Sequence, residues 1–231
     1  SKGRFSSLIP IFSRFSFLLK PKKELVEKSE KILKNIVNEL SKTVNFGYLY
    51  DEEPYSGALL YELGFEDAFR EYAKKVTEIF VSKGIKKIIT IDPHTHYILK
   101  VIYPKIVNFN IEVTNYLEFI KPDKKVSLNV AIHDSCLYSR FLDMYDTYRK
   151  ILDNMNIERK EHQVFTAKDV GGCCGGPIES LTPEISKRIA KIRVNELSKL
   201  SKNIVVVCPI CLANLSRVSD NVNIIDLAEL L

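Results

Sequence analysis

The chain has 231 residues, of which 45% are hydrophobic and 27% charged, a composition typical of a folded globular protein with one large domain or two small ones. No run reaches the roughly 18 to 20 apolar residues that a membrane-spanning helix needs, which argues against a transmembrane protein. The net charge is +5, but residues 1–23 carry six Lys or Arg and no acid, so the rest has 28 basic against 29 acidic residues. A nucleic-acid-binding face would need basic residues spread over a folded surface, so nucleic acid is not an expected partner.

The first predicted element is a basic amphipathic tail, residues 1–23. Apolar side chains fall on one helical face of this segment, namely those of Ile11, Phe12, Phe15, Leu18 and Leu19. A short, basic, Phe-rich helix can lie in the interface of an anionic membrane, and it can equally pack into a groove on a partner subunit. The Arg and Ser content without acid also resembles an organellar transit peptide. We expect the tail to make peripheral membrane contact or to dock on a partner.

Strands and helices alternate along the rest of the chain. A helix near residues 24–42 is followed by the segment "KIITIDPHTHYIL", and further on come a strand in "KKVSLNVAIH" and a helix over 138–155. The stretch "TPEISKRIAKIRVNELSKL" predicts a helix with Thr182 as cap, Pro183 in the first turn and one apolar face, formed by Ile185, Ile189, Ile192 and Leu200. "NIVVVC" then predicts a buried strand, a short helix follows, and "VNIIDLAELL" ends the chain. This alternation predicts an α/β fold with parallel sheets.

The two halves of the chain repeat each other. "KIITIDPHTHYIL" aligns with "IVVVCPICLANL", so that Asp92 matches Cys208 and Thr95 matches Cys211, while Gly57 matches Gly175. The alignment predicts two pseudo-repeated domains, residues 24–120 and residues 121–231. The first copy has lost every thiol and is predicted to be a degenerate scaffold, whereas the second carries the site.

All five cysteines lie after residue 130, and they are Cys136, Cys173, Cys174, Cys208 and Cys211. An odd, clustered set indicates metal or redox cysteines in a reducing cytoplasm rather than a secreted disulfide framework. Carboxyl ends of parallel strands converge on ligands, and Cys136 and Cys208 each follow a strand, so we expect the thiols to meet. Soft sulfur ligands select zinc, copper(I) or an iron–sulfur centre, and nearby glycines let the backbone approach such a centre.

The order HDSC, 36 residues, CCGG, 33 residues, CPIC resembles the cysteine-rich "CCG" domain. That domain occurs in heterodisulfide reductase and in the iron–sulfur, membrane-anchor subunits of anaerobic glycerol-3-phosphate, lactate, glycolate and some succinate dehydrogenases. His133, Asp134, Arg140, Tyr148 and Arg149 extend the resemblance, which covers about residues 24–231. It implies that the five cysteines hold one noncubane [4Fe–4S] cluster, with zinc as the alternative. The first repeat lacks these ligands, so a second centre is not implied, and any ferredoxin-like clusters would belong to a partner subunit.

Several other residues are candidates for the surroundings of the cluster. His133 could donate a hydrogen bond to a cluster sulfur, with a strand-end histidine bonded to a carbonyl as the alternative. Gly172 and Gly175 flank the paired cysteines, and Arg140, like Arg149, could steer an anion or balance thiolate charge. His94 and His96 lie with Asp92 in the degenerate repeat, where a replacement metal site is a weaker alternative.

Three functions remain open at this point. The first is an iron–sulfur electron-transfer subunit of a multi-subunit oxidoreductase, relaying electrons between a flavin-containing dehydrogenase partner and a membrane quinone or another carrier. The chain has no GxGxxG dinucleotide site of its own, which is why that partner is expected. The second is a heterodisulfide-reductase-like subunit that cleaves a disulfide at the cluster, and the third is a zinc-stabilised anchoring or assembly subunit. The predicted location is the cytoplasm, with the inner face of the membrane as an option.

Overall fold

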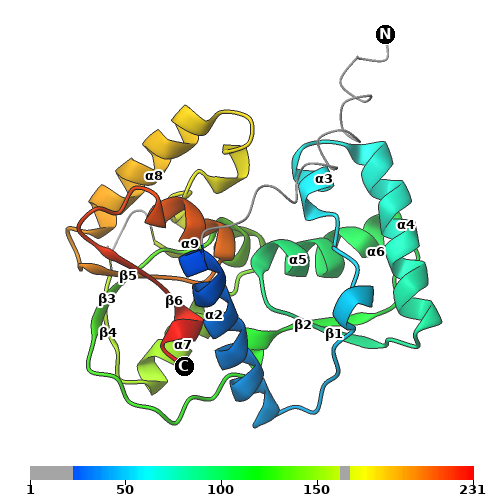
Figure 1. The fold of residues 1–231 in the computed structure, drawn as a ribbon, viewed down its shortest axis with the longest axis horizontal. Coiled ribbons are helices and arrows are strands. Elements are labelled where there is room, and N and C mark those ends of the chain that lie inside the picture. Colours follow the sequence, from blue (N-terminus) through cyan, green and yellow to red (C-terminus); the bar gives the residue numbers. More distant parts are fainter. Residues whose placement is uncertain (1–22, 162–166) are drawn as a thin grey trace.

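A computed structural model describes residues 23–161 and 167–231, so the predicted amphipathic tail lies, except for Lys23, outside the described residues. The α/β prediction is confirmed, since helices surround parallel strands (Figure 1). Within the described ranges, no helix is both long enough and apolar enough to cross a membrane. The elements are α2 (Lys23–Ser41), α3 (Ala58–Glu62), α4 (Glu66–Ser82), β1 (Lys87–Thr90), α5 (Pro93–Tyr97), α6 (Tyr103–Ile106), β2 (Glu112–Asn115), β3 (Asn129–Ile132), α7 (Tyr145–Asn154), β4 (Glu158–Lys160), α8 (Pro183–Leu197), β5 (Asn203–Val206), α9 (Pro209–Ser216) and β6 (Asn223–Asp226).

The strands form two parallel sheets. In the smaller sheet β1 pairs with β2, with Lys87 opposite Glu112 and Thr90 opposite Asn115. The larger sheet has the order β4-β3-β5-β6, so β3 and β5 are its central strands. Their inner residues, such as Val130 and Val205, are fully buried because helices cover both faces of a parallel sheet. Figure 1 shows the two sheets in opposite halves of the molecule.

The two halves share backbone details that the sequence repeat predicts. Strands β1 and β5 are each followed by a helix with proline in its first turn, and β2 and β6 each end in a short 3-10 turn closed by a capping box. Gly57 and Gly175 both adopt the left-handed conformation, with φ of 78° and 80°. Glycine is needed at such a position because other residues meet steric strain there. The repeat is thus visible in the structure, while its division into two domains at residue 121 stays a prediction.

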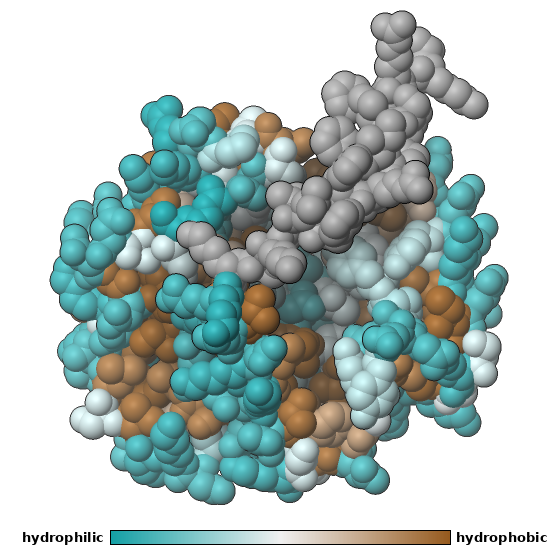
Figure 2. Space-filling model, in the orientation of Figure 1, coloured by the Kyte–Doolittle hydropathy of each residue, from teal (hydrophilic) through white to brown (hydrophobic). Residues whose placement is uncertain are grey.

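Packing crosses that predicted boundary. Ile36 and Leu40 of α2 lie in one core with Leu227 and Ala228, at the far end of the chain. The Asn35 side chain donates to the carbonyl of Ala228 at 2.8 Å, so α2 is fixed to the second unit by a hydrogen bond as well. Figure 2 shows hydrophobic surface on both sides of α2. The exposed apolar side chains of this helix are those of Leu25, Val26, Leu33 and Val37.

Two predicted helices differ from those observed. The helix expected over 138–155 is interrupted, because a π-helical segment over 137–141 ends before α7, and Asp143 between them has a φ of 53°. In α8 the predicted apolar face is wrong, since Ile185 and Ile192 are 51% and 68% exposed.

The buried side of α8 combines apolar residues of the core with small and charged residues, because part of this side faces the glycine loop and the histidine of the site. The buried residues are Ser186, Ala190, Arg193, Val194 and Leu197. Thr182 occupies the N-cap position but makes no side-chain cap hydrogen bond. Its hydroxyl donates to the carbonyl of Ile178 instead.

Candidate metal centre

The structure brings the five cysteines together at the carboxyl ends of β3 and β5. Cys136 follows β3, Cys208 follows β5 and precedes α9, and Cys211 lies in the first turn of α9. Cys173 and Cys174 come from the glycine-rich loop before the short turn Gly176–Ile178. All five thiols are free, and neighbouring sulfurs interact in the order Cys136, Cys173, Cys174, Cys211 and Cys208. The predicted convergence is therefore present.

The glycine loop donates backbone amides to the sulfurs. The amide of Gly175 donates to Cys173 Sγ at 3.2 Å, and that of Gly176 donates to Cys174 Sγ at 3.3 Å. A Cβ at Gly176 would lie 2.3 Å from the Ile210 side chain, and one at Gly175 would lie 2.8 Å from the Ser186 carbonyl. The loop can therefore lie against α8 and α9 only with glycine at both positions. At Gly172, a Cβ would meet the Arg193 side chain at 3.4 Å.

The crowded thiols cannot all ionise without a compensating positive charge. Hydrogen bonds from Cys136 and Cys174 lower the pKa of Cys173, and those two thiols, which hold the protons, have raised pKa values. Burial opposes ionisation of Cys208, but hydrogen bonds from Cys211 and His94 lower its pKa to about 5. The pKa of Cys211 is raised well above its ordinary value by its bonds to Cys174 and Cys208. A bound cation or cluster would replace the remaining protons, because thiolates are the metal-binding form.

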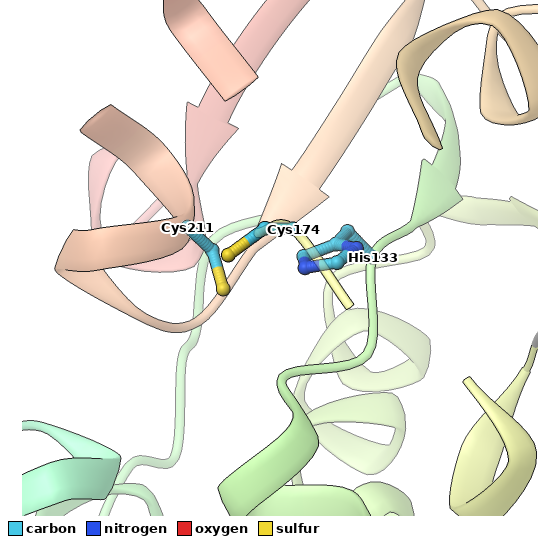
Figure 3. Close-up of side chains that lie close together, drawn as sticks. All are labelled: His133, Cys174 and Cys211. Carbon is cyan, nitrogen blue, oxygen red and sulfur yellow. The ribbon is translucent and has the colours of Figure 1, made fainter. Parts of the chain in front are cut away.

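His133 faces two of these sulfurs from the end of β3. A ring nitrogen of His133 lies within 4.8 Å of Cys174 Sγ and Cys211 Sγ (Figure 3). Its Nε2 has no hydrogen-bond partner, although the residue is only 1% exposed. The other ring nitrogen, Nδ1, accepts a hydrogen bond from Arg193 Nε at 3.2 Å. Because arginine is only a donor, Nδ1 must carry the lone pair, and the proton of the neutral ring resides on Nε2.

The protonation of this ring decides what His133 can do. Burial, followed by the charge of Arg193, lowers its pKa to about 3, so the ring is neutral. A metal at Nε2 would need the other tautomer, in which the Nδ1 proton would point at the Arg193 donor. This tautomer makes Nε2 an N–H donor and not a ligand atom, while the hydrogen bond to a cluster sulfur considered from the sequence stays a prediction.

A buried ion-pair network holds the turn between β3 and Cys136. Asp134 accepts from Arg149 through both carboxylate oxygens, at 2.8 and 2.9 Å, and from the Lys168 amide at 2.7 Å. Tyr148 donates to the same carboxylate, and Glu161 pairs with Arg149. Arg149 is thus 4% exposed and fully paired, so the suggestion that it steers an anion is wrong. Arg140 is exposed on the π-helical segment, where it can still meet an anion from solvent.

One residue of the cysteine-free half reaches the site. His94 Nε2 lies 3.7 Å from Cys208 Sγ, and His94 Nδ1 is hydrogen-bonded to Glu62. Burial opposes a charge on this ring, but the bonds to Cys208 and Glu62 raise its pKa to about 10. Asp92 instead caps α5 by accepting from the amides of His94 and Thr95, and His96 Nδ1 bonds to Thr90 Oγ1 at 2.7 Å. Among the described residues, Asp92, His94 and His96 form no group of potential metal ligands.

Two contributions to the site could not be found from the sequence. Arg193 lies on α8, where the apolar pattern of the sequence predicts the wrong buried face. No feature of the sequence therefore indicated that Arg193 contacts His133. His94 occupies a position equivalent to the middle of the CPIC segment, and the repeat therefore placed it at the carboxyl end of β1. That it meets Cys208 depends on how the two halves pack, which the repeat does not determine.

The comparisons with known proteins identify relatives of the cysteine-bearing half. Residues 130–216 match the family model of the cysteine-rich domain named CCG, so the resemblance inferred from the cysteine spacing is confirmed. The chain is 30% identical over 207 residues to the probable iron–sulfur-binding oxidoreductase FadF of Bacillus subtilis, covering 81% of this chain and 29% of the relative. It is 30% identical over 213 residues to the EtfAB:quinone oxidoreductase of Syntrophomonas wolfei, again with 81% and 29% coverage.

A third relative is one of the subunits of the dihydromethanophenazine:CoB–CoM heterodisulfide reductase of Methanosarcina mazei. Here the identity is 26% over 206 residues, which cover 82% of this chain and 50% of the relative. The chain thus spans half or less of the length of these three relatives.

Proposed function

We propose that this protein is an iron–sulfur electron-transfer component of an oxidoreductase complex, with Cys136, Cys173, Cys174, Cys208 and Cys211 as the ligands of one [4Fe–4S] cluster of the noncubane type. The observation that carries the proposal is the convergence of five free sulfurs, two of which accept backbone N–H groups. Zinc is normally held by four ligands in structural sites, which would leave one cysteine spare. When bound, an iron–sulfur cluster accepts and releases single electrons.

The surrounding residues have distinct tasks in this proposal. The amides of Gly175 and Gly176 donate to two of the sulfurs, and the Nε2–H group of His133 would donate to another. Hydrogen bonds to sulfur raise the reduction potential of such a centre. Arg193 fixes the ring of His133, and the Asp134–Arg149 pair fixes the turn that carries both His133 and Cys136. Burial of Cys174, Cys208 and Cys211 limits access of water to one side of the centre.

The names of two relatives support a proposal about the partners. One is named as a quinone oxidoreductase acting with EtfAB, and another as part of a heterodisulfide reductase. We propose that this protein passes electrons between a flavin-containing dehydrogenase, or a ferredoxin-like iron–sulfur subunit, and a membrane quinone or another carrier. The proposed location is the cytoplasm or the inner face of the membrane, with residues 1–23 as the contact.

A redox titration of anaerobically reconstituted protein tests the electron-transfer role. We expect a visible absorbance and a paramagnetic signal that appear and disappear reversibly over several cycles of reduction and oxidation. Because all five cysteines are proposed ligands, each single Cys→Ser variant should lose both the reversible absorbance change and the paramagnetic signal. A reconstituted protein with bound iron but no reversible redox change would contradict the proposal.

Disulfide cleavage at the same site is a second candidate, favoured by the partial exposure of Cys136 and Cys173. A disulfide could reach that side of the centre from solvent. The reaction would take one electron from each of two molecules of a reduced one-electron carrier and two protons from solvent, break the S–S bond and release two thiols. Incubation with reduced viologen and a mixed disulfide, followed by thiol titration, separates the candidates: stoichiometric viologen oxidation and thiol release would establish cleavage, and their absence would leave electron transfer alone.

A further inference from the structure

The half of the chain without cysteines contributes directly to the cysteine site. Its residue His94 lies at the start of α5, after β1, and is 114 positions away from Cys208 in the sequence. The two side chains are nevertheless 3.7 Å apart and both buried, with exposures of 8% and 1%. Solvent therefore does not compete for this contact.

The His94 ring is held from its other side as well. Nδ1 is hydrogen-bonded to a carboxylate oxygen of Glu62, the last residue of α3. Asp92 accepts the amides of His94 and Thr95 at 2.9 Å, which fixes the backbone from which the ring projects. Two carboxylates of the first half, those of Glu62 and Asp92, therefore place one ring nitrogen of His94 against a sulfur of the second half.

We propose that His94, oriented by Glu62, donates an N–H hydrogen bond to the Cys208 ligand, so that the cysteine-free half sets the reduction potential of the centre in the other half. A carboxylate beside Nδ1 and a thiolate beside Nε2 are both acceptors, and a ring between two acceptors donates from both nitrogens. A donor at a ligand sulfur stabilises the reduced, more negative state of the centre. His94 is thus a positioning residue that acts through Cys208, and the degenerate half is not only a scaffold.

This inference rests on the proposed iron–sulfur function, and the test uses the full chain reconstituted with iron and sulfide without oxygen. The midpoint potential is measured against a reference dye for the wild type and for His94→Leu, His94→Gln and Glu62→Gln. We expect His94→Leu to lower the reduced-to-oxidised ratio at least tenfold at the same dye potential, which is 59 mV for a one-electron couple. His94→Gln keeps a donor of similar reach and should recover part of the shift, and Glu62→Gln should give a smaller loss.

The matched control is His96→Gln. His96 lies in the same helix and is also buried, but it contacts Thr90 and not a sulfur. This variant tests whether loss of packing in α5 alone moves the potential. We expect an unchanged potential, even where the thermal midpoint falls.

A second readout does not need the cluster. In iron-free protein labelled with nitrogen-15 in histidine, the Nε2 resonance of His94 should change on Cys208→Ser, whereas that of His96 should not. A wild-type protein that binds no iron would overturn the proposed function. A wild type that binds iron, with a potential unmoved by His94→Leu or moved equally by His96→Gln, would overturn this inference alone.

Discussion

The two halves of the molecule share their backbone and differ in what their loops hold. The strands β1 and β5 are each followed by a helix with Pro at its first position. The residue before this helix is Asp92 in the first half and Cys208 in the second. One oxygen of the Asp92 carboxylate accepts hydrogen bonds from two backbone amides of its own helix, whereas the Cys208 sulfur interacts with Cys211 and His94. The glycine turns, prolines and capping boxes therefore maintain the fold, while the residues at the ligand positions can differ without a change in backbone conformation.

The largest difference between the halves should be in iron content, when a proposed ligand in one half and the equivalent residue in the other are each substituted. Cys173→Ser should remove most of the bound iron and the visible absorbance, because the serine hydroxyl is a poor ligand for iron and remains protonated at neutral pH. Tyr55 precedes Gly57 by two residues, as Cys173 precedes Gly175, so Tyr55→Phe is the matching change in the first half. It should leave the iron content unchanged, since Tyr55 is 55% exposed. Iron analysis of both purified variants decides it; equal iron in Cys173→Ser and wild type would contradict the ligand assignment.

The second comparison concerns the buried ion pair that only the cysteine-bearing half contains among the described residues. Arg149→Met leaves the Asp134 carboxylate buried without its partner, and removing one member of such a pair costs about 3–5 kcal/mol. Arg217→Met, which breaks the exposed pair with Glu179, should cost less than about 1 kcal/mol. Urea unfolding of the two variants measures both values. Similar losses would show that the Asp134 network does not hold the site.

Two equivalent capping boxes differ by one charge and give a pH prediction. Burial raises the pKa of Asp226 to about 7, while its counterpart in the first half is Asn115, which cannot ionise. Below pH 7 the folded state keeps a proton that the unfolded state releases near pH 4, so this group's stabilisation is lost as the pH rises to 7.

Asp226→Asn removes the ionisable group, and with it the loss of stability at rising pH. The Asn side chain can still accept the hydrogen bond from the Ala228 amide. The stability of Asp226→Asn minus that of the wild type should therefore rise by about 3 kcal/mol between pH 5 and pH 8. Asn115→Gln should show no such trend. The measurement is urea unfolding at both pH values with the same metal content, and a difference that falls with pH would contradict the raised pKa.

The smallest contrast is between the two left-handed glycines. Gly57→Ala and Gly175→Ala should each cost about 1–3 kcal/mol because of the positive φ. The cost should be larger at Gly175, where the new Cβ would lie 2.8 Å from the Ser186 carbonyl, than at Gly57, where it would meet the Tyr72 side chain at 2.9 Å. A backbone atom in a helix cannot move aside as easily as a ring.

The two glycine variants should also differ in metal content. Only Gly175→Ala should lose iron, because the Gly175 amide donates to Cys173. Thermal unfolding and iron analysis check both parts of this prediction. Iron loss in Gly57→Ala alone would reverse the expected roles of the two halves.

Local signals in the sequence predicted much of this arrangement. The five-cysteine spacing predicted the meeting of the sulfurs, and the repeat predicted strands β1 and β5 at equivalent positions, because both depend on short segments and on strand ends. The buried side of α8 was not predictable from its apolar residues, since Arg193 is buried there for its contact with His133 and Ile192 is exposed. The contact of His94 with Cys208 depends on packing between distant segments, which no local pattern encodes.

The most direct test of the central claim is the content of iron, acid-labile sulfide and zinc in the full chain purified without oxygen. The five converging sulfurs predict about four irons with matching sulfide per chain and little zinc. One zinc per chain with neither iron nor sulfide would contradict the account and make the five cysteines part of a structural site.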